Sequence, residues 1–344
     1  GGGREHGEVR CRRGVGARRR PGCPVPRRQR IDQGVRHRLG PDRVAARAHR
    51  ARQPRDDPQL RGADVAGPPP VVLLDEPIPG SLRSGPPTLV RYDADGPNAR
   101  LTLDSPHNRN ALSSALVEQM HDGFTRASAE HGVRMVVLSH TGGTFCAGAD
   151  LSEVPSTDAA ATPAEMATER ARDLTRLLRR ILESPLPVIA AIDGHVRAGG
   201  LGLVGACDIA VAGRSSTFAL TEARIGVAPS IISLTLLPKM TARAAGRYFV
   251  TGEKFGADAA AEMGLITAAT DDVATTVAEL TSAIAWGSPQ GLAESKALTT
   301  AAILEDFDRH AEKLTQRSAA LFVSDEAREG MSSFLQKRRP NWVG

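Results

Sequence analysis

The aromatic residues and methionines that could anchor an apolar core are confined to the part of this 344-residue chain that follows residue 87. All twelve aromatic residues, every Met and every Lys lie from Tyr92 onward. The first 86 residues hold 19 Arg, no Lys and 9 acidic residues, whereas the remainder holds 25 basic and 30 acidic residues. A segment rich in Arg, Gly and Pro and without aromatic side chains cannot offset the conformational entropy lost on folding. The folded part is therefore expected within residues 87–344.

Residues 1–86 have three possible interpretations: a basic arm for nucleic acids, a targeting peptide, or sequence without an evolved structure. The Arg excess suits phosphate binding, but no aromatic side chain is interleaved for base stacking. The run Arg18, Arg19, Arg20 is not followed by an apolar stretch, which argues against a secretory signal. We favour the third interpretation, a disordered segment outside the native coding sequence, and expect no nucleic-acid partner.

From residue 88 the pattern predicts an α/β protein. Residues 88–93 and 99–104 alternate apolar and polar side chains around a Gly-Pro turn, which predicts a β-hairpin. Apolar residues at helical spacing over 112–124 predict a helix. The continuous apolar runs 134–139 and 188–192 are typical of buried strands.

A second helix is predicted to begin at Thr162. Pro163 suits its first position, and Glu165 completes a capping box with Thr162. The small polar residues 154–161 before it are expected to be mobile. Further strands are expected at 207–212 and 217–220.

After about residue 240 the sequence predicts mainly helices, several of them with clear start signals such as Ser288 before Pro289. Leu304, Phe307 and Leu314 share one helical face, which is typical of core packing or a subunit contact. The expected helices span 242–250, 257–264, 272–285, 290–302, 305–322 and 325–336.

Several functional classes are excluded by missing signals. The chain lacks GxSxG, HExxH and P-loop motifs, and no apolar run approaches the roughly 20 residues of a membrane span. A GxGxxG match, Gly200 to Gly205, lies six residues beyond its strand and outside the first βα unit, which argues against dinucleotide binding. Cys146 and Cys207 are expected to be buried thiols. We expect no metal or cofactor, and a cytoplasmic protein.

Two loops of small residues are candidates for binding an oxyanion. They span residues 145–151 and 193–200, and each follows a predicted buried strand. Small residues allow close backbone approach, and a glycine-rich segment that opens a helix directs N–H groups toward negative charge. Two such donors would polarise a carbonyl without a metal ion.

Four motifs, in order, resemble the crotonase, or enoyl-CoA hydratase/isomerase, family. They lie at residues 103–112, 145–151, 194–208 and 218–226, and the resemblance runs from about Pro87 to Trp342. It implies an α/β fold, a crotonase-type spiral of ββα repeats over 87–285 and a helical C-terminal oligomerisation subdomain over 286–344. It also implies a homotrimer or hexamer.

The resemblance further assigns site residues. The N–H groups of Ala149 and Gly199 would form the oxyanion hole for the thioester carbonyl. Glu222 matches the family's acid/base glutamate, and an apolar setting would raise its pKa. The family's coenzyme A groove and substrate contacts fall on Ala111, Ala147, Asp150, Leu151 and Gly200.

The sequence departs from well-known hydratases at Gly202, where they carry a second glutamate that helps to hold water. The missing carboxylate favours a Δ3,Δ2-enoyl-CoA isomerase, although hydration by Glu222 alone remains possible. Arg197 and His195 replace apolar residues, and Arg197 could bind a carboxylate on the acyl group, as in methylglutaconyl-CoA, or form an inter-subunit salt bridge. The run Ile225 to Leu237 is similar to the methylglutaconyl-CoA hydratase-like branch.

The leading hypothesis is an enoyl-CoA hydratase that adds water to a 2-enoyl-CoA thioester. The alternatives are the isomerase with the same residues and a crotonase-fold protein that binds acyl-CoA or RNA without turnover. Coenzyme A enters as part of the substrate, so no separate cofactor is expected.

Overall fold

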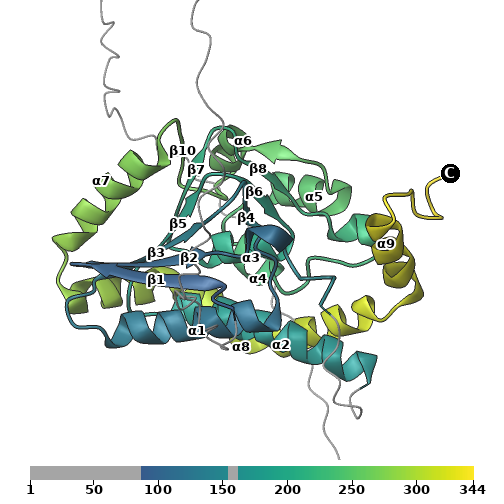
Figure 1. The fold of residues 1–344 in the computed structure, drawn as a ribbon, viewed down its shortest axis with the longest axis horizontal. Helices are drawn as coiled ribbons and strands as arrows, with labels where there is room; N and C mark the ends of the chain where they lie inside the picture. The colour runs from purple at the N-terminus through teal and green to yellow at the C-terminus, as the bar shows by residue number, and fades with distance from the viewer. Residues whose placement is uncertain (1–86, 154–161) are drawn as a thin grey trace, which may run out of the picture. The chain divides into compact units, whose positions relative to one another are not determined.

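The computed structural model describes residues 87–153 and 162–344, so the predictions for 1–86 and 154–161 lie outside the described residues. The larger of its two sheets has the strand order β1-β2-β3-β5-β7-β10 (Figure 1). Only β1 and β2 pair antiparallel, around the predicted Gly-Pro turn, and the other neighbours are parallel. These strands are β1 (Val90–Asp95), β2 (Asn98–Leu103), β3 (Met135–His140), β5 (Val188–Ile192), β7 (Ile209–Gly213) and β10 (Ala268–Thr270).

The smaller sheet has the order β4-β6-β8-β9. Three times, a strand of the larger sheet is followed along the chain by a strand of the smaller one: β3 by β4, β5 by β6 and β7 by β8. This repetition is the expected spiral. The sequence prediction missed β4, β6 and β9, and β10 of the larger sheet, because two or three residues are too few to show a period of two, although it placed β8 of the same length. The four strands are β4 (Thr144–Cys146), β6 (His195–Arg197), β8 (Thr217–Ala219) and β9 (Phe255–Gly256).

Helix starts follow the predicted capping signals. Thr162 accepts a hydrogen bond from the Glu165 N–H and completes the capping box, while Ser288 and Ser324 cap two C-terminal helices. The helices are α1 (Ser114–Ala129), α2 (Pro163–Glu183), α3 (Gly199–Ala206), α4 (Ser233–Leu236), α5 (Ala242–Thr251), α6 (Ala257–Glu262), α7 (Val273–Ala285), α8 (Pro289–Phe322) and α9 (Asp325–Leu335), with 3-10 turns η1 (Pro106–Asn108) and η2 (Glu222–Ile225).

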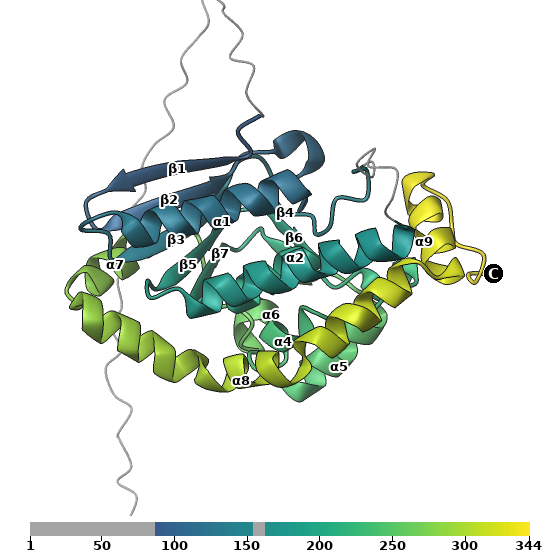
Figure 2. The same cartoon turned by 90° about the horizontal axis from the view of Figure 1, so that it is seen from below.

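The prediction of two helices at 290–302 and 305–322 is wrong. They form one 34-residue helix, α8, because no Gly or Pro interrupts the chain between them. Figure 2 shows α8 running beside α2, and its apolar face, which includes Phe307, contributes to the core. Core packing, one of the two roles expected of this stripe, is thereby confirmed.

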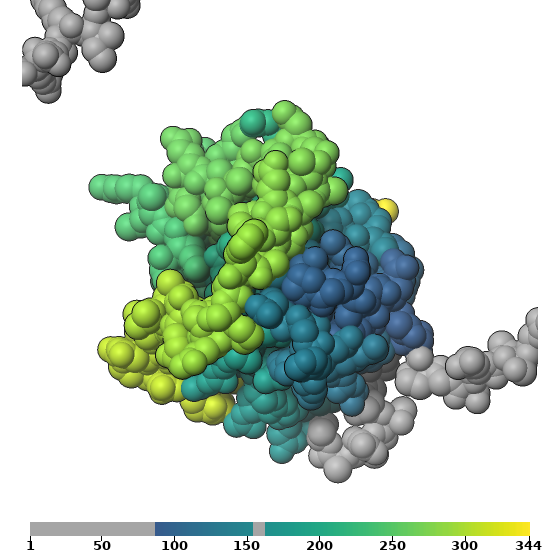
Figure 3. All heavy atoms as spheres, turned by 90° about the vertical axis from the view of Figure 1, so that its left-hand side faces the viewer, coloured from purple at the N-terminus to yellow at the C-terminus, as the bar shows by residue number. Residues whose placement is uncertain are grey.

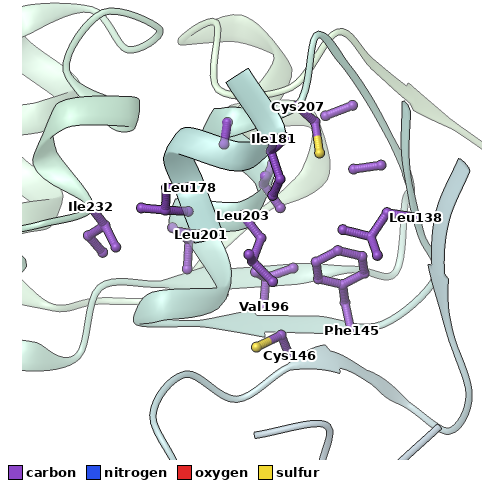
Figure 4. Close-up of a cluster of buried hydrophobic side chains, with 14 of the residues drawn as sticks. Leu138, Phe145, Cys146, Leu178, Ile181, Val196, Leu201, Leu203, Cys207 and Ile232 are labelled. Carbon is purple, nitrogen blue, oxygen red and sulfur yellow. The ribbon is translucent and has the colours of Figure 1, made fainter. Parts of the chain in front are cut away.

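The core lies between the sheets and the helices, and α3 passes through it with all eight residues buried (Figure 4). Both described cysteines, Cys146 and Cys207, are buried as predicted, and burial raises the pKa of each thiol to about 12. A second apolar cluster forms where α7 packs on the other face of the larger sheet; Figure 3 shows α7 crossing that face beside the blue hairpin. Among the described helices, none has the length and apolarity to cross a membrane.

A buried ion pair attaches α8 to the sheet. Lys296 Nζ lies 2.8 Å from Asp208 Oδ2, and the Lys296 side chain is 3% exposed. The ammonium also donates to the carbonyls of Ile181, at 2.8 Å, and Leu186, at 3.1 Å. The same Asp208 oxygen accepts from the Val188 N–H at 2.7 Å. One charged pair therefore joins α8 to the end of α2 and to the starts of β5 and β7.

Replacing Lys296 alone is expected to be costly. Lys296→Met leaves the Asp208 carboxylate buried without its cation, so the free energy of unfolding should fall by about 3–5 kcal/mol. Adding Asp208→Asn should restore part of that loss. Arg309→Met, which breaks an exposed pair with Glu305, should cost under about 1 kcal/mol. Denaturant titration of the four proteins tests this, and equal losses for Lys296→Met and Arg309→Met would refute it.

Candidate active site

The loop after β4 is held by a short backbone pairing with the residues before α1. The Leu112 N–H donates to the Gly148 carbonyl at 2.7 Å, and the Leu112 carbonyl accepts from the Asp150 N–H at 3.4 Å. Ala149 lies opposite Leu112 in this parallel bridge. Because its neighbours make the bridging bonds, the Ala149 N–H is left to face the other way.

The segment before α1 is itself anchored by Asn110, a residue to which the sequence analysis gave no role. Asn110 is fully buried, and its Nδ2 donates to the carbonyls of Thr141, at 3.0 Å, and Thr144, at 2.7 Å. Its φ of 54° is a left-handed conformation that Asn tolerates better than most residues. The only feature of the sequence that pointed to Asn110 was its place in the first family motif, residues 103–112.

The second loop presents Gly199 as the first residue of α3. Ala198 before it has φ 46° and ψ −122°, an unfavourable backbone for a residue with a side chain. The Ala198 N–H donates to the Ala219 carbonyl at 3.1 Å, which joins this turn to the end of β8. The smaller sheet therefore stabilises the strained backbone conformation of Ala198. This conformation could not be predicted from the sequence.

The two loops touch through their backbones. A Cβ added to Gly148 would lie 3.1 Å from the Gly199 nitrogen and 2.8 Å from the Ala198 Cβ. A Cβ added to Gly199 would lie 3.8 Å from the Ala149 nitrogen. Within the described residues, the N–H groups of Ala149 and Gly199 donate to no protein acceptor. Two adjacent free donors, one at a helix start, suit a developing oxyanion.

Glu222 begins the η2 turn, three residues after the Ala219 carbonyl that holds Ala198. It is 7% exposed, and its Oε2 has no hydrogen-bond partner among the described residues. Burial raises the pKa of Glu222 to about 7, although a hydrogen bond from its own backbone opposes the shift. A buried carboxyl with one unpartnered oxygen that titrates near neutrality can both accept and return a proton.

The position of the missing second carboxylate is filled by apolar side chains. A Cβ on Gly202 would lie 2.4 Å from Ile232 Cγ2 and 3.4 Å from Leu178 Cδ1. Figure 4 shows Ile232 and Leu178 on one flank of α3, each pointing toward it. The departure from the hydratase pattern thus involves packing around Gly202 as well as the lost acid.

The residues predicted for the coenzyme A groove lie along the first loop and the segment bridged to it. Ala111 is buried, whereas Ala147, Asp150 and Leu151 are partly exposed. Burial would raise the pKa of Asp150, but hydrogen bonds from Ser152 and the Asn108 amide outweigh it and lower the pKa. Asp150 thus stays ionised and orders this loop. Contacts of these four residues with coenzyme A remain a prediction.

Two other predicted substrate contacts have structural partners. Gly200 packs on β4, since a Cβ there would lie 2.7 Å from the Cys146 carbonyl oxygen. The Arg197 guanidinium donates to the carbonyls of Val196 and Thr217, at 2.8 and 2.6 Å, and to Thr217 Oγ1. Burial lowers the pKa of Arg197, and no carboxylate pairs with it in the described part of the chain. Neither predicted role is tested by these contacts.

Two surface hollows of about 400 and 370 Å³ lie elsewhere, one between α2 and α8 and the other between α7 and the larger sheet. Neither is lined by Ala149, Gly199 or Glu222. The candidate site is therefore identified by the hydrogen-bonding state and burial of its groups, and not by these two hollows.

Comparison with known proteins agrees with this geometry. Residues 97–344 match the family model described as enoyl-CoA hydratase/isomerase. A crystal structure of an enoyl-CoA hydratase from Mycobacterium avium is 64% identical, with TM-score 0.70, and the match covers 75% of this chain and 100% of that one.

Two curated relatives cover similar spans. Enoyl-CoA hydratase EchA19 of Mycobacterium tuberculosis is 32% identical over 76% of this chain and 98% of its own length. The 1,2-epoxyphenylacetyl-CoA isomerase of Escherichia coli is 30% identical over 71% of this chain and 94% of its own length. Free backbone donors, a buried glutamate and these matches lead to one conclusion: the chain belongs to the enoyl-CoA hydratase/isomerase family.

Proposed function

We propose that this chain hydrates a 2-enoyl-CoA thioester, with the Ala149 and Gly199 N–H groups polarising the thioester carbonyl and Glu222 carrying the proton. The observation that supports this most is the buried Glu222 carboxyl with an unpartnered Oε2. The 64% identical structure named as an enoyl-CoA hydratase supports the same choice of reaction.

One carboxylate suffices if it acts twice. The Glu222 carboxylate takes a proton from water as the water oxygen bonds to C3, and the electron pair of the C2–C3 double bond moves into an enolate. The two N–H groups hold the enolate oxygen, a contribution that is typically worth 10²–10³-fold in rate per donor. The protonated Glu222 then returns the proton to C2. Water is added overall, and the carboxylate is regenerated.

Isomerisation of a 3-enoyl-CoA is the second candidate, and the apolar filling around Gly202 favours it. Here the Glu222 carboxylate removes a proton from C2, giving a dienolate, and returns it to C4. No water needs to be held, so the absent second acid costs nothing. A relative named as an isomerase shows that the family includes such proteins.

The proposal uses no metal and no cofactor, because the backbone donors supply the polarisation and coenzyme A is part of the substrate. Assembly into trimers or hexamers and a cytoplasmic location stay predictions of the family resemblance. So does an acyl group that bears a carboxylate. The Arg197 guanidinium has N–H groups beyond its three bonds to the sheet, and these are the donors that such a carboxylate would use.

Activity should depend on Glu222. Crotonyl-CoA should lose its conjugated absorbance and gain the mass of one water, whereas growth of that band from 3-hexenoyl-CoA would identify the isomerase. Glu222→Gln cannot take a proton, so turnover of the active substrate should fall at least about 10²-fold while acyl-CoA binding is retained. Full activity in Glu222→Gln would exclude the mechanism, and binding without any turnover by the natural chain would support the non-catalytic alternative.

The rate should follow the ionisation of Glu222. Both candidate reactions start from the carboxylate, so kcat/KM should rise with pH through about 7 and fall about tenfold per unit below it. Since the folded pKa lies above the usual value of 4.5, stability from this group is lost as pH rises between these two values. Glu222→Gln should therefore be more stable than the natural protein at pH 8, by up to about 3 kcal/mol. A rate profile flat to about pH 5 would contradict the assignment.

Restoring the second acid should fail unless room is made for it. Gly202→Glu forces its Cβ against Ile232, so overpacking should lower the free energy of unfolding by about 1–3 kcal/mol without raising the hydration rate. Combining it with Ile232→Ala should recover part of the stability. Gly246→Ala, at a helical glycine with open space, is the matched control. A stable, faster Gly202→Glu enzyme would show that the packing is not the obstacle.

A further inference from the structure

The η2 turn, which begins with Glu222, is held from two sides by later parts of the chain. On the α5 side, Arg224 Nε donates to the Thr251 carbonyl at 3.0 Å. Gly252 follows α5 with φ +60°, and a Cβ there would lie 2.9 Å from the Leu220 carbonyl oxygen. The end of α5 thus contacts the backbone that leads into η2.

On its other side, η2 meets α9 without intervening side chains. A Cβ on Gly330 would lie 2.4 Å from the carbonyl carbon and oxygen of Ile225 and 2.6 Å from its Cα. One on Gly226 would lie 2.5 Å from the carbonyl of Glu326. Both contacts are with backbone, which cannot rotate away as a side chain can. The position of α9 and that of η2 are therefore strongly coupled.

The α9 helix is itself stabilised by local contacts. Ser324 caps it by accepting from the Ala327 N–H at 3.2 Å, and Ala327 is fully buried. Ser333, also buried, donates to the Gly330 carbonyl at 2.9 Å. Beyond the helix, Arg338 forms a two-pronged pair with Glu329, at 2.6 and 2.7 Å. These bonds keep α9 formed, and its buried residues Ala327, Gly330 and Ser333 mark the face that packs on the rest of the chain.

We propose that α9 is a positioning element for Glu222, acting through the glycine contacts of Gly330 with Ile225 and of Gly226 with Glu326. The inference rests on the proposed function of Glu222. Within η2, the Glu222 carbonyl accepts from the N–H groups of Gly226 and Val227, so a shift at Gly226 is transmitted directly to Glu222. The C-terminal helix thereby sets where the carboxyl lies and how deeply it is buried.

Displacement of η2 has a definite electrostatic consequence. Burial is the cause of the raised pKa of Glu222, and no charged side chain in the described residues contributes to it. If α9 moves and water reaches the carboxyl, its pKa must fall toward the ordinary value. None of the other charged residues of η2, α5 and α9 contributes to the raised pKa of Glu222. They are Arg224, Arg243, Arg247, Asp325, Glu326, Arg328 and Glu329.

The first test is Gly330→Ala in the full chain, with Gly246→Ala as control because both glycines are helical and gain equally in helix propensity. The pKa of Glu222 is measured by NMR of ¹³C-labelled glutamate, with Glu222→Gln used for assignment. We expect about 7 in the natural protein and in Gly246→Ala, and a value nearer 4.5 in Gly330→Ala. In Gly330→Ala, kcat should fall at least about tenfold and KM should change less than about threefold.

The outcomes separate the two proposals. An unchanged pKa and an unchanged kcat in folded Gly330→Ala would overturn the role of α9 and leave the function of Glu222 intact. A lowered pKa with a kcat/KM profile that still rises through about pH 7 would support the role of α9 in burying the carboxyl and refute the catalytic role of Glu222.

A second variant covers the case in which Gly330→Ala does not fold. Ser324→Ala removes only the cap of α9, a loss of about 1 kcal/mol. If η2 opens with α9, hydrogen exchange of the Val227 amide should accelerate about fivefold together with the α9 amides. Faster exchange in α9 with no change at Val227 would show that the two elements open independently, which overturns the proposal.

Discussion

The close approach of Gly148 to Gly199 is the contact on which the candidate site depends. It allows two loops from different repeats to bring their backbones together, and any Cβ on Gly148 would collide with Ala198. The smaller sheet makes this approach possible, because β4 pairs with β6 and β6 with β8 in parallel register. These short strands, anchored in the core by Phe145, Val196 and Phe218, therefore determine where the N–H groups and Glu222 lie.

The site concentrates features that oppose stability. Ala198 occupies a strained backbone conformation, and Glu222 is buried without a partner for one oxygen. Such features persist only where the surroundings over-determine them. Here the surroundings are the Ala198–Ala219 hydrogen bond and the glycine contacts with η2, while the buried Lys296–Asp208 pair fixes α8, from which α9 continues.

Long apolar runs and capping residues made the larger sheet and most helices predictable. The runs at β3 and β5 are continuous because parallel strands are buried on both faces, and Thr162 with Glu165 fixed the start of α2. Among the strands of two or three residues, which carry no period, β8 was predicted, whereas β4, β6, β9 and β10 were found only in the structure. Glu222, Ala149 and Gly199 came from motif resemblance, whereas the strain at Ala198 arises from tertiary pairing that local sequence does not encode.

The packing around Gly202 bears on how this chain differs from two-acid hydratases. Had only the second glutamate been lost, a cavity beside α3 would remain, which is destabilising in a close-packed core. Instead Ile232 occupies the space, with Leu178 beside it. Ile232 belongs to the segment between η2 and α4 that also departs from the common family pattern. The two departures therefore lie in contact with each other, at Gly202 and Ile232, and in the proposed mechanism a single carboxylate carries the proton.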